Sequence, residues 1–218
     1  MSVVGVDEAG RGPVLGPLVI CAYAIDEAKL PALKKAGVRD SKLLTHEKRA
    51  ALVPMLLKEG RAALEIITAE QITSLMRKKI SLNEIEAQRG AEAIRKVMDG
   101  ASCVYVDSPD PVPKKFAHRL YKYLPQKLKI VSENKADYKY VVVGAASVIA
   151  KEKRDAEIDK IKRELRCDFG NGYPHDEATI HFLTQHKDDP ALQKYIRHEW
   201  ATAKRICGKG KQTRLVEK

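Results

Sequence analysis

Runs of apolar residues divide the chain into short strands and longer helices. β-Branched segments bounded by Gly, Pro or polar residues predict strands, and apolar residues spaced three and four apart predict helices. The predicted strands are Ser2–Val6, Leu18–Ile25, Leu64–Thr68, Val104–Asp107 and Leu128–Val131. The predicted helices are Thr45–Lys58, Ser81–Val97, Phe116–Leu124, Asp176–His186, Ala191–Ile206 and, as one helix or two abutting helices, Asp137–Leu165. This order indicates an α/β or α+β domain built around one mixed sheet.

Residues at the ends of these elements sharpen the prediction. Gly10–Pro13 predicts a turn that joins the first two strands into a hairpin. Thr45 is a typical helix N-cap, and Ser81 with Glu84 predicts a capping box. Gly170–Pro174 predicts a tight loop, and we expect the basic, polar segment after Gly208 to be disordered.

Length and composition restrict the class of protein. The chain has 218 residues with 44% hydrophobic residues, which suits one compact domain with an appended part. It contains no run of about 20 apolar residues and no signal-peptide pattern at its start, so we expect a soluble, cytoplasmic protein. The four cysteines are scattered and form no C-x-x-C pair, which argues against structural zinc.

The formal net charge of +11 agrees with a polyanionic partner and equally with an ordinary surface of solvated lysines. The placement of the charge adds information, because residues 201–218 carry six Lys or Arg residues against the single acid Glu217. The charge alone does not decide between these two interpretations.

Four acids occupy positions that suit chemistry. Asp7 and Glu8 follow the first apolar strand, Asp107 ends the strand that begins at Val104, and Asp137 precedes an apolar run. Acids at element ends that converge on one sheet edge would form a site of hard oxygen ligands, which suits Mg²⁺ or Mn²⁺. Together with a basic surface, such a site favours two-metal hydrolysis of a phosphodiester.

The glycine-rich turn permits two interpretations. The run from Gly10 to Gly16 follows a strand, as a dinucleotide-binding loop does, but the third Gly is one residue late and the next segment looks like a strand. Alternatively, the turn offers backbone N–H groups near Asp7 and Glu8 that can recognise a phosphate or a sugar hydroxyl.

Nine segments follow one another in a specific order over nearly the whole chain: Val6–Pro13, Gly16–Pro17, Arg39–Leu43, Tyr105–Asp107, Lys135–Asp137, Val141–Lys151, Arg154–Asp155, Gly170–Pro174 and Arg197–Arg205. In this collinear order they closely resemble the ribonuclease HII family of its archaeal type. The departures are small: Val141 and Gly144 stand where the family often has Pro and Ser, and Tyr138 stands where it often has an acid or a small residue.

The resemblance implies a ribonuclease H-like fold, with a central mixed sheet flanked by helices and a C-terminal helical extension. It implies Asp7, Glu8, Asp107 and Asp137 as the catalytic set that binds the divalent cations. The implied reaction is endonucleolytic hydrolysis on the 5′ side of a ribonucleotide, leaving 3′-hydroxyl and 5′-phosphate ends. Substrates would be RNA–DNA hybrids and duplex DNA with embedded ribonucleotides, as in replication and ribonucleotide excision repair.

The resemblance also implies contacts with the substrate. We expect backbone groups of Gly10, Arg11 and Gly12 to contact the ribose 2′-hydroxyl, and Tyr173 to pack against the adjacent deoxyribose. Lys42 is expected to contact the backbone near the cut. Arg11 is a second candidate for that contact, and Lys151 and Arg154 are weaker candidates because neighbouring acids can pair with them.

The expected organisation has three parts: a catalytic domain over 1–166, a helical part over 167–207 that helps to bind substrate, and a basic tail over 208–218. We expect a monomer with no membrane contact. Gln212 and Leu215 resemble the start of a sliding-clamp-binding box, but no aromatic residues follow, so the tail is better interpreted as a non-specific nucleic-acid contact. The rivals are a non-catalytic nucleic-acid-binding module, which leaves the four acids unexplained, and a dinucleotide-dependent enzyme.

Overall fold

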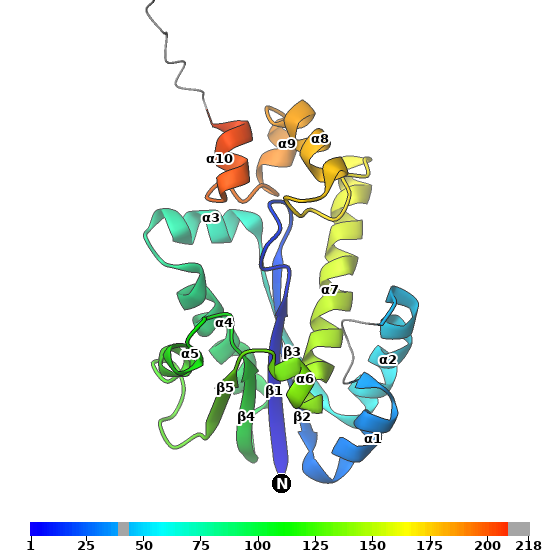
Figure 1. Cartoon of the computed structure of the whole chain (residues 1–218), viewed down its shortest axis with the longest axis vertical. Coiled ribbons are helices and arrows are strands. Elements are labelled where there is room, and N and C mark those ends of the chain that lie inside the picture. The colour runs from blue at the N-terminus through cyan, green and yellow to red at the C-terminus, as the bar shows by residue number, and fades with distance from the viewer. Residues whose placement is uncertain (39–43, 209–218) are drawn as a thin grey trace, which may run out of the picture.

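The computed structural model describes residues 1–38 and 44–208, which form a mixed five-stranded sheet in the order β3-β2-β1-β4-β5 (Figure 1). The strands are β1 (Ser2–Ala9), β2 (Leu18–Asp26), β3 (Arg61–Ile67), β4 (Ala101–Asp107) and β5 (Ile130–Glu133). β1 pairs with β2, and β2 with β3, in antiparallel fashion, whereas β1–β4 and β4–β5 are parallel. The predicted hairpin and the predicted mixed sheet are therefore confirmed.

Helices cover both faces of the sheet, and a C-terminal helical group lies beyond the end of β1 (Figure 1). The helices are η1 (Glu27–Lys29), α1 (Leu30–Lys35), α2 (His46–Glu59), α3 (Ala69–Arg77), α4 (Leu82–Val97), α5 (Pro113–Leu120), α6 (Ala136–Lys139), α7 (Val141–Leu165), α8 (Glu177–His186), α9 (Pro190–Gln193) and α10 (Ala201–Cys207). One face of the sheet packs against α7, which α1 and α2 flank, and the other face packs against α4 and α5.

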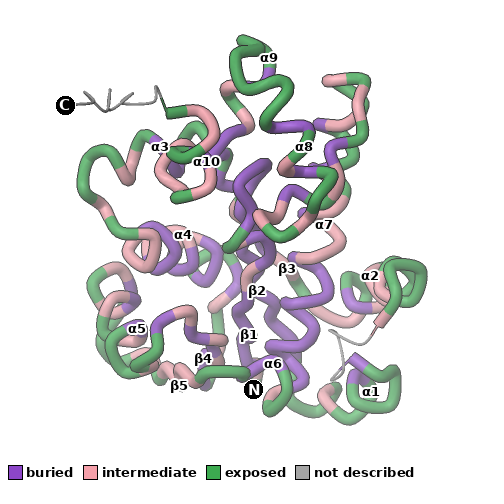
Figure 2. The backbone as a smooth tube through the Cα atoms, turned by 45° about the horizontal axis from the view of Figure 1, so that its top comes forward, coloured by how far each residue is buried: buried purple, intermediate pink, exposed green. Residues whose placement is uncertain are grey.

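The alternation of β1 sends its side chains into two separate cores. Val4 and Val6 join the core on the α4 side, while Val3 and Ala9 join the core on the α7 side. The first half of α7 is buried almost throughout, as the purple tube in Figure 2 shows. A third cluster joins the end of α7 to α8, α9 and α10. The strand that carries the first acids is therefore fixed on both faces by apolar packing.

Most predicted helices are confirmed, with differences at their ends. Thr45 caps α2, and the region from Asp137 onward is two abutting helices, α6 and α7. The predicted capping box at Ser81 is only half formed: Ser81 accepts a hydrogen bond from the Glu84 amide, but the Glu84 side chain pairs with Arg119 instead. The helix predicted at Phe116–Leu124 begins earlier, at Pro113, and ends at Leu120.

The single helix predicted over Ala191–Ile206 is wrong. The structure has two short helices, α9 and α10, separated by an irregular segment in which Ile196 forms an isolated β-bridge with Leu15. The Arg197 amide donates to the Val14 carbonyl, and the Gly16 amide donates to the Tyr195 carbonyl. These backbone groups are satisfied by the distant hairpin rather than by their own helix, and a local pattern cannot reveal such pairing.

Two helical regions were absent from the sequence prediction. Residues 27–35 form η1 and α1, and Ala69–Arg77 forms α3, which begins with a complete capping box between Thr68 and Gln71. Within residues 1–38 and 44–208, no helix combines the length and the apolar character that crossing a membrane requires.

Gly5 allows α7 to approach β1 closely, because a Cβ built there would lie 2.2 Å from the backbone oxygen of Val142. We expect Gly5→Ala to lower the free energy of unfolding by about 3 kcal/mol, since neither backbone can yield without disturbing the core. Gly90→Ala in α4 is the matched control, because its added Cβ finds only Leu120 at 3.8 Å. The control should raise stability by up to about 1 kcal/mol. Equal unfolding midpoints in urea for the two variants would contradict this packing.

Candidate active site

Asp7 and Asp107 lie at or near the ends of two neighbouring strands, on the same face of the sheet. Asp107 ends β4, whereas β1 runs past Asp7 to Ala9, further than predicted. β1 and β4 are parallel with Val6 opposite Val106, so the residues that follow, Asp7 and Asp107, are adjacent in register. Asp7 is buried with 5% exposure and points toward α7, where its pKa responds to a hydrogen bond with Ser147. Parallel pairing thus brings together two carboxylates that are 100 residues apart in the sequence.

Asp137 reaches the same edge from α6. The Ala136 amide at the start of α6 donates to Oδ1 of Asp107 at 2.8 Å, which fixes this helix against the end of β4. Asp137 is 2% exposed, and its charge contributes to raising the pKa of Asp7. The three acids predicted at element ends therefore lie near one another.

Glu8 points to the other face of the sheet, toward α4. Burial raises the pKa of Glu8 well above its usual range, and the charge that adds most to this effect is that of Glu86 of α4, followed by Asp7 and Asp107. Arg11 opposes the shift. Glu8 thus interacts electrostatically with the other acids while its immediate surroundings differ from theirs.

Burial and mutual repulsion dominate the electrostatics of these acids. Burial raises the pKa of Asp7 from 3.8 to about 7, and the neighbouring Asp107 adds to the increase. Such a group of carboxylates is relieved by protons or by a cation. Hard carboxylate oxygens are the ligands that Mg²⁺ and Mn²⁺ prefer, so the donor set fits a divalent metal.

Within residues 1–38 and 44–208, a tight cluster of metal-ligand-type atoms lies away from the four acids. One ligand atom from each of His46, Glu152 and Asp155 lies within 4.8 Å of the others, at the contact between α2 and α7. Arg49 already binds there, with Nε 2.7 Å from Glu152 and Nη2 3.0 Å from Asp155. We interpret this group as an ion-pair cluster that fastens α2 to α7, because the guanidinium supplies the positive charge that a metal would bring.

The glycine-rich turn is held from within by Arg197, a fully buried residue of the C-terminal part. Its guanidinium donates to the carbonyls of Gly10 at 2.6 Å, Arg11 at 2.9 Å and Gly16 at 3.0 Å. The Trp200 indole donates to the Gly12 carbonyl at 3.1 Å. Gly10 has a φ of +82°, and a Cβ there would meet the Pro17 oxygen at 2.7 Å, so the turn requires glycine at this position.

The segment after the turn is strand β2 rather than a helix. A dinucleotide-binding loop requires a helix N-terminus at this point, so the structure excludes that interpretation.

The Arg11 side chain is 38% exposed, yet two of its nitrogens bind residues of α4. Its Nε lies 2.9 Å from Oε1 of Glu86, and its Nη2 donates to the Asn83 side chain at 2.6 Å. Glu86 is 2% exposed, and burial raises its pKa to about 7 although Arg11 opposes the shift. Arg11 therefore braces the turn against α4, and its contact with a substrate phosphate stays a prediction.

Tyr173 lies beside the turn, a proximity that the sequence did not predict. The Tyr173 ring is 3.4 Å from a Cβ built at Gly12, and Arg154 packs over the ring with its Cζ 5.1 Å from the centroid. A hollow of about 350 Å³ is lined by Glu8, Gly10, Arg11, Arg154 and Tyr173 among others. The structure thus gathers one catalytic candidate and most of the substrate-contact candidates around one opening.

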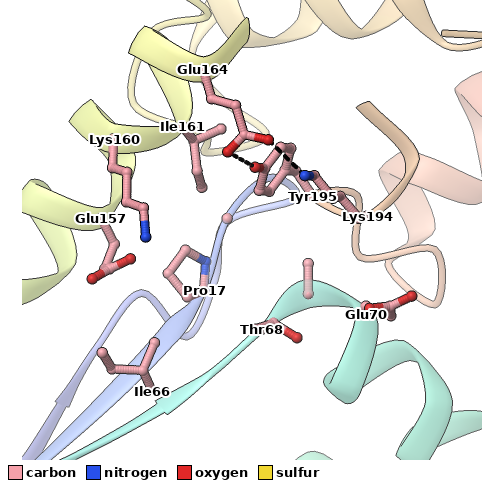
Figure 3. A pocket seen from close by; sticks show the side chains of 12 residues that line it. Pro17, Ile66, Thr68, Glu70, Glu157, Lys160, Ile161, Glu164, Lys194 and Tyr195 are labelled. Carbon is pink, nitrogen blue, oxygen red and sulfur yellow. Dashed lines mark hydrogen bonds and ion pairs between the residues drawn. The ribbon is translucent and has the colours of Figure 1, made fainter. Parts of the chain in front are cut away.

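A second hollow, of about 210 Å³, contains none of the predicted site residues (Figure 3). It lies between the start of β2, the end of β3, α7 and the segment after α9. In it Glu164 accepts hydrogen bonds from Lys194 at 2.6 Å and Tyr195 at 2.5 Å, which ties α7 to the C-terminal part. We assign this hollow a structural role.

Three of the positions predicted from the sequence fall outside the described residues. Lys42 lies in the segment 39–43, and Gln212 and Leu215 lie in the segment 209–218. Lys151 and Arg154, the weaker phosphate candidates, are both described and line the hollow with Tyr173. Arg154 is 7% exposed and donates to the Asn171 carbonyl at 2.6 Å, so it supports the loop that carries Tyr173.

Sequence reasoning missed Glu86 and the bracing role of Arg197. Glu86 offered a signal, because it lies on the helical stripe that continues through Gly90, Ala93 and Val97, all of them buried. An acid on an apolar stripe needs a partner, and Arg11 is that partner. Arg197 offered no comparable signal, because its acceptors are backbone carbonyls about 180 residues away.

The sheet and the acids at its edge define a nuclease of the ribonuclease H-like class. The family model described as "Ribonuclease HII" matches residues 4–203. Ribonuclease HII of Methanocaldococcus jannaschii is 41% identical, with 99% of each chain covered. The chain belongs to the ribonuclease HII family and is a hydrolytic nuclease.

Solved structures agree with this assignment. The ribonuclease H2 of Pyrococcus horikoshii OT3 superposes with a TM-score of 0.83 at 39% identity, covering 95% of this chain and 97% of that one. The PCNA:RNase HII complex from Archaeoglobus fulgidus contains a chain with a TM-score of 0.83 at 34% identity, covering 92% and 95%. The predicted ribonuclease H-like fold is confirmed.

The stability of the metal-free protein should fall as the pH rises from about 4 to about 7. Folding raises the pKa of Asp7 from 3.8 to about 7, so the folded state binds a proton that the unfolded state has lost in this interval. Asp107→Asn should make this pH dependence shallower, because it removes the neighbouring charge that raises the pKa of Asp7 most. Asp159→Asn, at an exposed site on α7, is the control and should leave the slope unchanged. Urea unfolding in a chelator across this range measures the effect, and stability that rises toward neutral pH would contradict it.

Removing the Arg197 guanidinium should loosen the turn. Arg197→Met leaves three carbonyls without their charged donor, and we expect a loss of about 3–5 kcal/mol in the free energy of unfolding together with a fall in nuclease activity. Arg205→Met, on the exposed side of α10, removes the same charge and should cost less than about 0.5 kcal/mol. Similar unfolding curves for both variants would show that the turn does not depend on Arg197.

Proposed function

We propose that this protein cuts the RNA strand of RNA–DNA hybrids and also cuts duplex DNA on the 5′ side of single embedded ribonucleotides. Family membership supports the endonucleolytic cleavage of hybrids. The observation that carries the proposal for this chain is the parallel pairing of β1 with β4, which brings Asp7 and Asp107 together on one face beside Asp137. Ribonucleotide removal during replication and repair would follow from this activity.

Asp7, Glu8, Asp107 and Asp137 are the proposed catalytic and metal-binding residues. Two divalent cations, Mg²⁺ or Mn²⁺, would supply Lewis acidity and charge neutralisation at the scissile phosphate. The protein's own contribution is to hold the carboxylates in a rigid, buried arrangement, because β1 is packed on both faces and α6 is bonded to Asp107. Preorganised charge of this kind needs little rearrangement during the reaction.

We propose that the turn Gly10–Gly12 recognises the ribose. Gly12 is exposed and has no side chain, so a sugar can approach the backbone, and the 2′-hydroxyl is the group that distinguishes RNA from DNA. Tyr173, supported by Arg154, offers a ring surface for the neighbouring deoxyribose. Lys42 stays a proposed phosphate contact, and the helical part 167–207 a proposed substrate-binding part.

Sliding-clamp binding also stays a proposal. The Archaeoglobus relative was solved in complex with PCNA. In this chain Leu215 is followed by Val216, Glu217 and Lys218, none of which is an aromatic residue that could fill a pocket, so we propose at most weak clamp binding. A stable complex between the intact chain and a clamp ring would contradict this.

A duplex with one central ribonucleotide tests the proposed function. The unaltered protein should nick it on the 5′ side of the ribonucleotide and leave a 3′-hydroxyl, in the presence of Mg²⁺ or Mn²⁺ only. Asp107→Asn should lower turnover by about 100-fold or more, because it removes preorganised charge at the reacting phosphate. An all-DNA duplex is the substrate control. Undiminished turnover in Asp107→Asn would remove this residue from the catalytic set.

The same assay separates the two proposed contacts with the sugars. Gly12→Val should block nicking without removing any functional side chain, because the new methyl groups would fill the space beside the Tyr173 ring. Tyr173→Ala should weaken cutting at single ribonucleotides more than cutting of long hybrids. Normal nicking by Gly12→Val, or an equal loss on both substrates for Tyr173→Ala, would contradict the respective role.

A further inference from the structure

A hollow of about 350 Å³ on α5 is lined by basic residues alone. Its lining consists of Lys114, Lys115, His118, Arg119 and Lys122. α5 buries Phe116 and Leu120 against the sheet, and this amphipathic arrangement directs the basic side chains outward. We name these five residues the α5 basic patch.

Part of this charge is already neutralised inside the protein. Glu84 pairs with Arg119 at 2.7 Å and with Lys122 at 3.2 Å, so these two residues anchor α5 to α4. In contrast, no acid in the described part of the chain forms an ion pair with Lys114, Lys115 or His118, all of which are exposed. The positive charge available to an external partner therefore resides at the start of α5.

The start of α5 is held rigidly relative to Asp107. The connecting loop 108–112 is pinned by Asn134, whose amide donates to the carbonyls of Ser108 at 3.0 Å and Asp110 at 2.9 Å. Asp110 in turn accepts from the Val112 amide at 3.1 Å. A ligand that contacts Lys114 and Lys115 would therefore keep a fixed register with the acid that ends β4.

A chain of side-chain contacts also connects the patch with the glycine-rich turn. Arg11 donates to Asn83, Asn83 donates to Asp110 at 3.1 Å, and Arg119 lies 3.9 Å from Asp110. Only two side chains separate the turn that we propose to bind ribose from the α5 basic patch. This connection runs through Asn83 of α4, so α4 and the loop 108–112 hold the turn and the α5 basic patch in a fixed arrangement.

We propose that Lys114, Lys115 and His118 bind the sugar–phosphate backbone of the substrate duplex at a distance from the cut, a proposal that rests on the proposed function. Exposed lysines are point charges suited to phosphates and carry no base-reading geometry. The contact therefore adds affinity and register rather than sequence preference. It assigns a substrate-binding role to the catalytic part of the chain, separate from the helical part 167–207.

The test combines a charge-neutralising variant with duplexes of different length. Binding of Lys114→Gln/Lys115→Gln is measured without divalent cation on a long duplex with one central ribonucleotide, and on duplexes shortened from either side. On the long duplex the variant should bind on the order of tenfold more weakly at low salt, and its salt slope should fall by about 2. Shortening the arm that covers α5 should abolish the difference from the unaltered protein, since the two changes remove the same contact. Turnover at saturating substrate should be unchanged.

Lys34→Gln/Lys35→Gln on α1 is the matched control, with the same loss of charge from two exposed lysines beside α7. The control should keep both the affinity and the dependence on arm length. Unchanged affinity of Lys114→Gln/Lys115→Gln, or an equal loss on every duplex length, would overturn the proposal. The two proposals can also be separated. If Lys114→Gln/Lys115→Gln binds duplex DNA more weakly but the unaltered protein does not nick any ribonucleotide, the proposed function is contradicted and the proposed binding surface is supported.

Discussion

The buried guanidinium of Arg197 is the interaction on which the site depends. It binds the carbonyls of Gly10, Arg11 and Gly16 and therefore fixes the loop between the two hairpin strands from the inside. A guanidinium can satisfy several acceptors at once because its donors form a rigid planar fork. Burial lowers the pKa of Arg197 to about 9, which still leaves it charged at neutral pH. The conformation of the glycine-rich turn is thus held by hydrogen bonds from the C-terminal part of the chain.

The acids impose the opposite constraint. Asp7 and Asp137 are buried and Asp107 is half-buried, at an edge where β1 and β4 pair and α6 is bonded to Asp107. Their repulsion acts against folding, and the apolar cores on both sides of β1 outweigh it. A site that is destabilised in this way gains most when a cation binds, because the cation removes repulsion as well as forming new bonds. Stability and metal affinity are therefore coupled through the same carboxylates.

The sequence predicted those parts of the structure that local patterns determine. Strand periodicity located β1 and β4 and thereby placed Asp7 and Asp107 near one edge of the sheet. The segment 194–200 was predicted as helix and is not, because its backbone bonds to Val14 and Gly16. The contacts of Arg11 with Glu86 and Asn83 were also outside the prediction. In both cases the deciding partner is far away in the sequence.

The basic residues near the site differ in their partners, and for this reason the net charge alone did not indicate which of them could contact a substrate. Arg11, Arg49, Arg154 and Arg197 all have their guanidinium groups engaged by carboxylates, amides or carbonyls within the protein. These arginines hold the turn, the loop that carries Tyr173 and the contact between α2 and α7, and they therefore shape the site. Lysines at the start of α5 have no such partners in the described ranges. An arginine guanidinium binds most favourably where several fixed acceptors surround its planar fork. A lysine ammonium group is strongly hydrated and is therefore most favourable at an exposed surface, where it keeps its water. Substrate attraction in this fold is therefore expected from exposed lysines, while the arginines near the acids determine geometry.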